Sequence, residues 1–316
     1  MPREIPNSSE IVWKKEFIDR YSKLTNIEEF KKYSLSFLRR SIRINTLKSS
    51  ISHMKKILLD LSWKHEQIPW CKDGFYVENP NRRDIGNLTE HALGFFYVQE
   101  AASMIPPIVL DAKPNETVLD MCAAPGSKST QIASMMKNTG VLISNDSDKT
   151  RINALRMNLE RCGVTNAIVT NMEGGWFKKS GVVFDKILLD APCSGIGTIR
   201  KSLKTIRIWN PKMATKISLI QKDLILTAFD MLKSGGIMVY STCTLEPEEN
   251  EGVIDYLIKN RDGVVIEPIE LDIKRSVPVT YFEGKKYSDE VLKTLRIWPQ
   301  DNDTEGFFVC KIKKSK

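Results

Sequence analysis

The sequence predicts an α/β fold with a mainly parallel sheet covered by helices on both faces, preceded by a small α+β module. From Phe95 onward, strand-like and helix-like segments alternate, which is typical of βαβ units. The strand-like segments are short and almost wholly apolar, as expected of a sheet buried on both faces. Before Phe95, strand-like and helix-like segments do not alternate in this regular way, so we divide the chain into residues 1–98 and residues 99–316.

The first part shows helical spacing of apolar residues from Ser8 to about Phe37. The segment Ser41–Leu47 then alternates apolar and polar residues like a half-buried strand. A helical period returns from Ile51 to Leu61 behind a serine-rich start that can cap a helix, and Phe75–Val77 is a further short strand.

In the second part, the elements follow in a regular order. We predict strands at Thr117–Asp120, Val141–Asn145, Ala167–Thr170, Lys186–Asp190 and Ile237–Thr242. Helices are predicted near Ser129–Lys137, Lys149–Cys162, Pro211–Leu232 and Pro247–Asn260. A β-hairpin formed by Leu295–Trp298 and Gly306–Lys311, with a polar turn between its strands, closes the fold.

The composition is that of a globular protein, with 41% hydrophobic and 27% charged residues among 316. No apolar run is long enough to span a bilayer and the N-terminus has no secretory pattern, so we expect no membrane partner and a cytoplasmic location. The net charge of +8 favours a polyanionic partner such as nucleic acid. Residues 1–98 hold 17 Lys and Arg against 12 Asp and Glu, a net of +5; a solvated basic surface without a ligand remains the alternative.

The cysteines point to chemistry rather than to metal binding. The six thiols lie at positions 71, 122, 162, 193, 243 and 310, without a Cys-x-x-Cys pair, and the chain has only three histidines. We therefore expect no metal site and free thiols in a reducing compartment. Cys71, Cys162 and Cys310 are interpreted as small buried hydrophobic residues.

The loop after the first strand of the second part is a candidate ligand-binding loop, because ligands of such sheets lie beyond the C-terminal ends of the strands. Its small residues let a ligand approach the backbone closely, and it leads into the N-terminus of a helix. An ordinary strand-to-helix turn is the alternative, and neither the P-loop nor the dinucleotide spacing is present. The loop consists of Cys122, Ala123, Ala124, Pro125, Gly126, Ser127 and Lys128.

Acidic residues follow the next two strands. Asp146 stands where nucleoside-binding sheets hold ribose hydroxyls, although a lone acid there is more often a helix cap. Arg151 follows on the next helix. Glu173 after the third strand is the weakest candidate, because a surface glutamate in a loop is common.

Two thiols follow the last two parallel strands. Asp190 ends the predicted strand Lys186–Asp190, and Cys193 follows it; Cys243 follows the predicted strand Ile237–Thr242. Neighbouring strand ends therefore bring both thiols into one crevice with Asp190 and Lys128. A thiolate is a strong nucleophile, and a second thiol beside a carboxylate suggests a covalent mechanism with a step that breaks the bond again. The alternatives are buried core cysteines, an exposed loop acid and a solvated lysine.

Several segments resemble the Sun/Fmu (Nop/Sun) family of RNA cytosine-C5 methyltransferases, which use S-adenosylmethionine. The main matches are Met121–Lys128, Asp190–Gly195 and Ser241–Thr244. Further matches occur in the same order along nearly the whole chain, at Arg43–Leu47, Gln99–Ser103, Glu248–Glu251 and Arg296–Phe308. The layout is closest to short archaeal-type tRNA methyltransferases. Two positions depart from the family pattern: Ser127 replaces a glycine, and Glu173 replaces an aspartate.

The resemblance implies a Rossmann-like class I methyltransferase and assigns a role to each candidate. Cys243 would add to C6 of cytosine, Asp190 would stabilise the adduct, Lys128 would position Asp190, and Cys193 would assist product release. The loop Cys122–Lys128 would bind S-adenosylmethionine with Asp146, Arg151, Glu173 and Asp190.

Transfer RNA is the preferred substrate, because longer members of the family carry additional domains often linked to ribosomal RNA. Ribosomal RNA is the alternative within the class, and a catalytically silent RNA-binding or assembly factor is the alternative outside it. A small-molecule or protein methyltransferase would leave the paired thiols unexplained. We expect a monomer. Candidates for gripping the RNA backbone, any of which could instead be a solvated charge, are Arg39, Arg40, Arg43, Lys55, Lys56, Arg200, Lys201 and Lys204.

Overall fold

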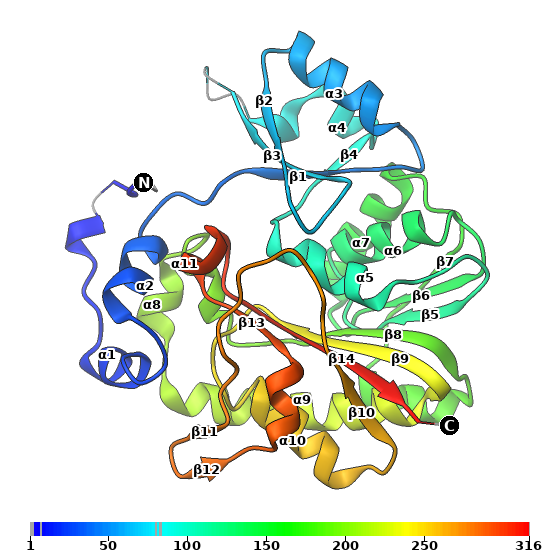
Figure 1. Cartoon of the computed structure of the whole chain (residues 1–316). Coiled ribbons are helices and arrows are strands. Elements are labelled where there is room, and N and C mark those ends of the chain that lie inside the picture. Colours follow the sequence, from blue (N-terminus) through cyan, green and yellow to red (C-terminus); the bar gives the residue numbers. More distant parts are fainter. Residues whose placement is uncertain (1–2, 7, 80, 82–83, 316) are drawn as a thin grey trace.

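The computed structural model describes residues 3–6, 8–79, 81 and 84–315. It contains one large mixed sheet, a smaller antiparallel sheet and a two-stranded ribbon (Figure 1). The predicted α/β fold with an additional N-terminal α+β module is confirmed.

The large sheet has the order β10-β14-β9-β8-β5-β6-β7, and β13 pairs with β14. Strands β5 to β9 are parallel, whereas β10 and β13 both run antiparallel to β14, which is itself antiparallel to β9. The chain fills the β5-β6-β7 side first and then crosses to β8 and β9, so the topological switch point lies between β5 and β8. The strands are β5 (Thr117–Asp120), β6 (Val141–Asn145), β7 (Ala167–Thr170), β8 (Phe184–Asp190), β9 (Leu232–Thr242), β10 (Val264–Glu267), β13 (Leu295–Ile297) and β14 (Phe307–Lys314).

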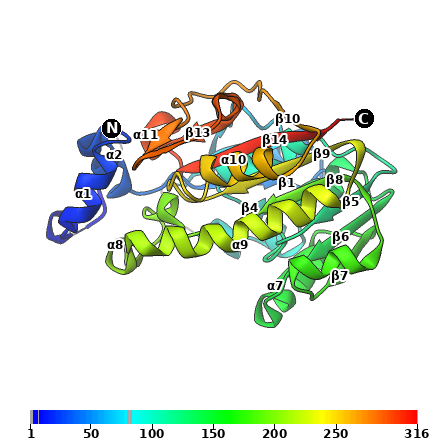
Figure 2. The ribbon, with the colours of Figure 1, turned by 90° about the horizontal axis from the view of Figure 1, so that it is seen from below.

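Helices cover both faces of this sheet. One face packs against α5 and α6, whose apolar side chains form a core with Val118 and Val239. The other face packs against α9 and α10 (Figure 2), around Leu189 and Phe308. The helices of this part are α5 (Ile105–Leu110), α6 (Ser127–Met135), α7 (Lys149–Arg161), α8 (Lys204–Ile208), α9 (Pro211–Asp230), α10 (Glu251–Asn260) and α11 (Pro299–Asn302).

The smaller sheet has the order β2-β3-β1-β4, with all its pairs antiparallel. Its core joins Ile42, Phe75 and Phe96 to Met54 and Leu58 of α3. The Ser50 hydroxyl accepts a hydrogen bond from the His53 amide and so caps α3, as the serine-rich start predicted. The elements of this module are β1 (Ser41–Ile44), α3 (Ile51–Asp60), β2 (Lys64–Gln67), β3 (Gly74–Glu78), α4 (Thr89–Ala92) and β4 (Phe96–Val98).

The first two helices, α1 (Lys15–Tyr21) and α2 (Ile27–Ser34), pack against the part of the chain that forms the large sheet, beside α8 and α11 (Figure 1). Phe17 stacks on Tyr21 with a centroid distance of 4.2 Å, and the edge of Trp209 meets Phe17 at 5.0 Å. Phe30 meets Trp298 edge to face at 5.7 Å. This aromatic cluster ties the N-terminal helices to the segments that follow β8 and β9.

Several boundaries differ from the sequence-based expectation; the smaller shifts include β8, which begins at Phe184 rather than Lys186, and α6, which begins at Ser127 rather than Ser129. Strand β9 begins at Leu232 rather than Ile237 and continues through Gly235 and Gly236. Helix α10 begins at Glu251 rather than Pro247. The expected C-terminal hairpin exists as β13 and β14, but the connection between them contains α11. The strands that were not predicted are β2, β4, β10, β11 (Tyr281–Phe282) and β12 (Lys285–Lys286).

Short 3-10 helices complete the described chain. They are η1 (Ser8–Glu10), η2 (Ile85–Asn87), η3 (Ala102–Met104), η4 (Gly174–Ser180), η5 (Ile196–Thr198) and η6 (Asp289–Lys293).

Candidate active site

The small-residue loop between β5 and α6 is held from the next strand and helix. The Asp146 carboxylate accepts a hydrogen bond from the Ala124 amide at 3.1 Å and lies 3.4 Å from the Arg151 guanidinium, which also donates to the Ala124 carbonyl oxygen. Gly126 has φ +104°, a conformation that glycine adopts without steric cost. Ser127 begins α6 and is not among the residues with positive φ, so its replacement of glycine introduces no backbone strain there.

Three aspartates surround this loop, at the C-terminal ends of β5, β6 and β8. Asp120 is fully buried and accepts a hydrogen bond from the Ser129 hydroxyl at 2.6 Å, whereas its other carboxylate oxygen has no partner within the described structure. Burial raises the pKa of Asp120 to about 7. Asp146 is also buried, and the side chain of Asp190 is 26% exposed. A cationic group that entered this loop would therefore meet acidic side chains from three strands.

Two further candidates for the cofactor site are Cys122 in the β5–α6 loop and Glu173 after β7. Burial raises the pKa of the Cys122 thiol far above its usual range, so this cysteine is not a thiolate in the free protein. Glu173 follows β7, is exposed, and precedes η4, where its carbonyl oxygen accepts from the Trp176 amide. Its proposed contact with a cofactor therefore stays a prediction.

The two predicted thiols lie together. Cys193 follows β8, Cys243 follows β9, and their sulfur atoms are 3.3 Å apart. Both side chains are half-buried and unoxidised. The hydrogen bond with Cys243 and burial raise the pKa of Cys193 well above its ordinary value, so Cys193 is protonated. The register of β8 on β9, with Asp190 opposite Ser241, creates this neighbourhood.

The predicted acid and lysine form an ion pair beside these thiols. Lys128 donates to one carboxylate oxygen of Asp190 at 2.7 Å, and Ser241 donates to the other at 2.6 Å. Burial alone would lower the pKa of Lys128, but the attraction of Asp190 outweighs it and the pKa is raised. The lysine is therefore charged. Sequence reasoning missed Ser241 and also Ser103, whose hydroxyl accepts from Lys128 at 3.0 Å.

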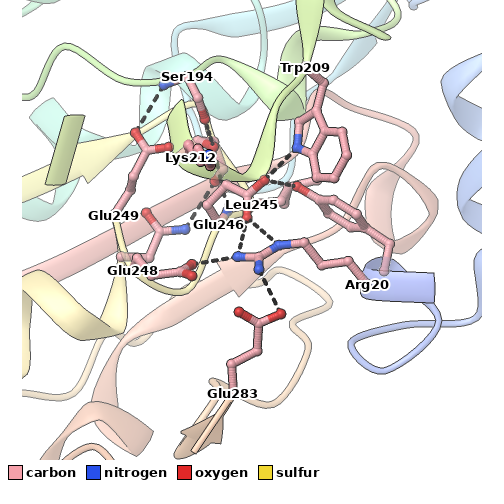
Figure 3. A network of polar contacts seen from close by, with 12 residues as sticks. Arg20, Ser194, Trp209, Lys212, Leu245, Glu246, Glu248, Glu249 and Glu283 are labelled. Carbon is pink, nitrogen blue, oxygen red and sulfur yellow. Dashed lines mark hydrogen bonds and ion pairs between the residues drawn. The ribbon is translucent and has the colours of Figure 1, made fainter. Parts of the chain in front are cut away.

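A buried network anchors the loop after Cys243 (Figure 3). The Glu246 carboxylate accepts from the Arg20 guanidinium at 2.7 and 2.9 Å, and from Tyr21 and Trp209 at 2.8 Å each. Arg20 also contacts Glu248 at 2.6 Å and Glu283 at 3.0 Å. The loop that carries the candidate nucleophile is therefore fixed by α1, a helix far away in sequence.

A second glutamate anchors the loop after Cys193. Glu249 accepts hydrogen bonds from the Ser194 amide at 2.9 Å and from the Gln221 side chain at 3.0 Å (Figure 3 shows the first of these). Burial raises the pKa of Glu249 to about 7. Glu246 and Glu249 belong to the same turn before α10, so one short segment holds the loops of both thiols.

Two of the arginines proposed for RNA binding are buried instead. Arg43 donates to Gln99 and Thr130, both at 2.8 Å, and is 2% exposed. Arg200 donates to Asp303 at 2.6 Å and is 6% exposed. Their guanidinium groups join segments of the fold, and the prediction that they grip RNA was wrong.

The other candidate cations remain at the surface. Arg40, Lys56, Lys201 and Lys204 are exposed, and Lys55 lies over the Phe75 ring. Arg39 lies 3.6 Å from the Tyr76 ring centroid and 2.5 Å from Glu66. Arg39 and Arg40 line a groove of about 870 Å³. The charged residues of its lining are Arg3, Arg39, Arg40, Lys64, Glu66, Glu78 and Asp303.

Among the residues that the structure describes, no group of three or more His, Cys, Asp or Glu side chains is arranged to hold a metal ion. No helix in the same residues has the length and apolar character needed to cross a membrane.

Comparison with known proteins assigns the family. Residues 107–313 match the model of the 16S rRNA methyltransferase RsmB/F family, and residues 14–101 match that of the N-terminal domain of 16S rRNA methyltransferase RsmF. The fold thus belongs to an RNA methyltransferase family. The chain is a member of this RsmB/F family, which confirms the resemblance found in the sequence.

Curated relatives include proteins named for two RNA substrates. The tRNA (cytosine(49)-C(5))-methyltransferase of Pyrococcus abyssi is 50% identical over 96% of this chain and 96% of its own length. The ribosomal RNA small subunit methyltransferase F of Vibrio vulnificus is 43% identical over 92% of this chain, which spans only 60% of that protein.

Solved structures agree over the whole fold. A methyltransferase homolog protein from Pyrococcus horikoshii has a TM-score of 0.87 and 36% identity, and the match covers 98% of this chain and 99% of that one. NSun6 from Pyrococcus horikoshii, crystallised with SFG, has a TM-score of 0.84 and 25% identity, covering 96% of this chain and 98% of that one.

Proposed function

We propose that this protein methylates carbon 5 of a cytosine in transfer RNA, with S-adenosylmethionine as methyl donor. Activity as an S-adenosylmethionine-dependent RNA cytosine-C5 methyltransferase agrees with its family and relatives. The single observation that carries the mechanism is the 3.3 Å approach of Cys193 and Cys243 beside the Asp190–Lys128 ion pair. A protein that only bound RNA would have no need of this arrangement.

The residues around the β5–α6 loop fit the cofactor. S-adenosylmethionine supplies an electrophilic methyl group on a cationic sulfur. The loop Cys122–Lys128 would hold it together with Asp146, Arg151, Glu173 and Asp190. The unpartnered oxygen of buried Asp120 and the nearby carboxylates give this loop the negative character that a cation requires.

The protein's own groups explain the covalent steps. Carbon 5 of cytosine is a poor nucleophile, so the Cys243 thiolate first adds to C6, and the electron pair of the C5–C6 double bond moves into the ring. Negative charge develops on the ring as the adduct forms, and Asp190 stabilises it by sharing a proton with N3, while Lys128 holds Asp190 in place. Once C5 carries its methyl group, a solvent water takes the C5 proton, the electron pair of that C–H bond restores the C5–C6 double bond, and the sulfur–C6 bond breaks with its electron pair on the Cys243 sulfur.

Cys193 is placed to assist that last step. It is protonated, and its sulfur lies within hydrogen-bond distance of the Cys243 sulfur. Donation of this proton toward the departing sulfur would favour release of the product.

The preference for transfer RNA is supported by sequence identity. The relative named as a tRNA methyltransferase is 50% identical to this chain, and the relative named as a ribosomal RNA methyltransferase is 43% identical. The target base has to leave its stack to reach Cys243, and the groove that Arg39 and Arg40 line is a candidate site for the flanking backbone. We expect the enzyme to act as a cytoplasmic monomer.

The proposal is tested with purified protein, labelled S-adenosylmethionine, and either unmodified transfer RNA or small-subunit ribosomal RNA, followed by mapping of 5-methylcytosine. Transfer to transfer RNA is the expected result. Methyl transfer to ribosomal RNA alone would show that ribosomal RNA, not transfer RNA, is the substrate. No transfer to either RNA would favour a catalytically silent RNA-binding factor.

Substitution of the thiols tests the mechanism. Cys243→Ala is expected to abolish turnover, and Cys193→Ala to accumulate a covalent protein–RNA adduct that survives a denaturing gel. Cys162→Ala, which removes a buried thiol at the end of α7, is the matched control and should do neither. Activity retained by Cys243→Ala would show that another group is the nucleophile.

A further inference from the structure

The segment before α5 reaches the catalytic ion pair through a chain of hydrogen bonds. Glu100 accepts from the backbone amides of Ala102 at 2.7 Å and Ser103 at 3.1 Å, so its carboxylate caps the 3-10 helix η3. The capped turn presents the Ser103 hydroxyl to Lys128 at 3.0 Å. Lys128 then donates to Asp190 at 2.7 Å.

Hydrogen bonds also link Glu100 to the backbone of Cys243, the candidate nucleophile. Its second carboxylate oxygen accepts from the Glu305 amide at 3.2 Å. The next residue, Gly306, donates to the Gly197 carbonyl at 3.0 Å, and the Gly197 amide donates to the Cys243 carbonyl at 2.9 Å. Glu100 therefore lies between two hydrogen-bonded paths, one leading to Lys128 and the other to Cys243.

We propose that Ser103 and Glu100 are positioning residues of the methylation reaction, which fix the Lys128 ammonium group against Asp190. A lysine side chain has four rotatable bonds and a compact charge, so one ion pair does not define its position. The Ser103 hydroxyl supplies a second acceptor, and Glu100 fixes that hydroxyl by capping its turn. Two of the three ammonium protons of Lys128 therefore have acceptors, the Ser103 hydroxyl and the Asp190 carboxylate.

This inference rests on the proposed function, and the burial of the contacts supports it. Lys128 is 8% exposed, so water competes little with the Ser103 hydroxyl. The Phe307 ring lies 5.7 Å from the Lys128 nitrogen and closes another side of the site. Loss of the serine hydroxyl would leave the lysine free to rotate away from Asp190, without a change in the thiols or in the cofactor loop.

The experiment is a double-mutant cycle on single-turnover methylation of the RNA that the wild-type protein modifies. Ser103→Ala is expected to lower the methylation rate about tenfold, as for loss of a hydrogen bond to a charged group. The KM for S-adenosylmethionine should change by less than about threefold, because the hydroxyl contacts no cofactor-loop backbone. Ser103→Thr should restore most of the rate.

The double-mutant cycle distinguishes a positioning role of Ser103 from a general loss of structure. If Ser103 acts through Lys128, Ser103→Ala should cause no further loss in a Lys128→Met background. Glu100→Ala should lower the rate at least as much as Ser103→Ala, and Glu100→Gln should recover part of it. The control is Ser218→Ala, which removes a buried hydroxyl bonded only within α9.

Two results would overturn the inference: a wild-type rate for Ser103→Ala, or a full additional tenfold loss when it is combined with Lys128→Met. An inactive wild-type protein on both RNAs would instead reject the proposed function itself.

Discussion

Arg20 offers the sharpest test of how the nucleophile loop is held. Its side chain is 5% exposed and its main partner Glu246 is 1% exposed, so the pair lies almost out of water. Burial lowers the pKa of Arg20, but Glu246 and Glu248 outweigh burial and raise it, so the cation is firmly retained. Arg20→Met would keep much of the side-chain volume and leave the buried carboxylates without a cation. Removal of one partner from a buried pair typically costs about 3–5 kcal/mol.

The assay is urea denaturation followed by fluorescence, with Lys293→Met as the matched control. Lys293 pairs with Glu290 at 2.7 Å, but both side chains are more than 40% exposed, so its loss should cost about 0–1 kcal/mol. Because Glu246 lies three residues after Cys243, the Arg20 variant should also lose methylation activity at temperatures where it remains folded. A loss below about 1 kcal/mol for Arg20→Met would show that the buried network contributes no more than a surface ion pair.

Two further predictions concern buried groups near the site. The pKa of Asp120 is about 7 in the folded protein and about 3.9 in an unfolded chain, so its stabilising contribution is present below pH 4 and is lost as the pH rises to 7. Asp120→Asn should therefore become more stable relative to wild type between pH 4.5 and 7.5 in thermal melts, by up to about 3 kcal/mol; an unchanged difference would contradict the raised pKa. Gly197→Ala would place its Cβ 2.7 Å from the Cys243 carbonyl oxygen and closer still to that of Gly306, so it should cost about 1–3 kcal/mol and slow adduct formation. Gly86→Ala, whose nearest contact would be 3.5 Å, is the control, and equal behaviour of the two variants would show that the close approach is unimportant.

The sheet could be predicted from the sequence because its strands are local apolar runs. Three strands, β5 to β7, have the predicted bounds. Strand β9 extends further than predicted, because Gly235 and Gly236 stay in the strand, although such a pair usually marks a turn. The helix α10 starts late, because the Asn250 backbone, with φ −110° and ψ −97°, is not helical.

The strand-end residues could also be predicted, because the topology of a parallel sheet places them at one edge. Cys193, Cys243, Asp190 and Lys128 do meet there. The partners that orient them could not be found in this way. Ser103 reaches Lys128 from a turn outside the sheet, and its sequence gives no periodic or charge signal.

The positive charge of an arginine did not reveal from the sequence whether its side chain lies at the surface or is buried. Arg43 and Arg200 belong to basic stretches that look solvent-facing, yet each is buried and bonded to segments distant in sequence. Arg20 contacts Glu246 across 226 residues of chain. A guanidinium with several acceptors in a fixed geometry can be buried at low cost, and single-sequence patterns do not reveal those acceptors.

These long-range contacts explain how one short turn, which carries Glu246 and Glu249, can hold the loops of both thiols in place. Glu246 fixes the Cys243 loop to α1, and Glu249 fixes the Cys193 loop through the Ser194 amide, so a shift of the turn moves both loops together. Covalent catalysis on a base needs the two sulfur atoms to keep their spacing while bonds to one of them form and break. Because both anchors belong to one turn, displacement of α1 should alter the position of both thiols in the crevice more than their separation.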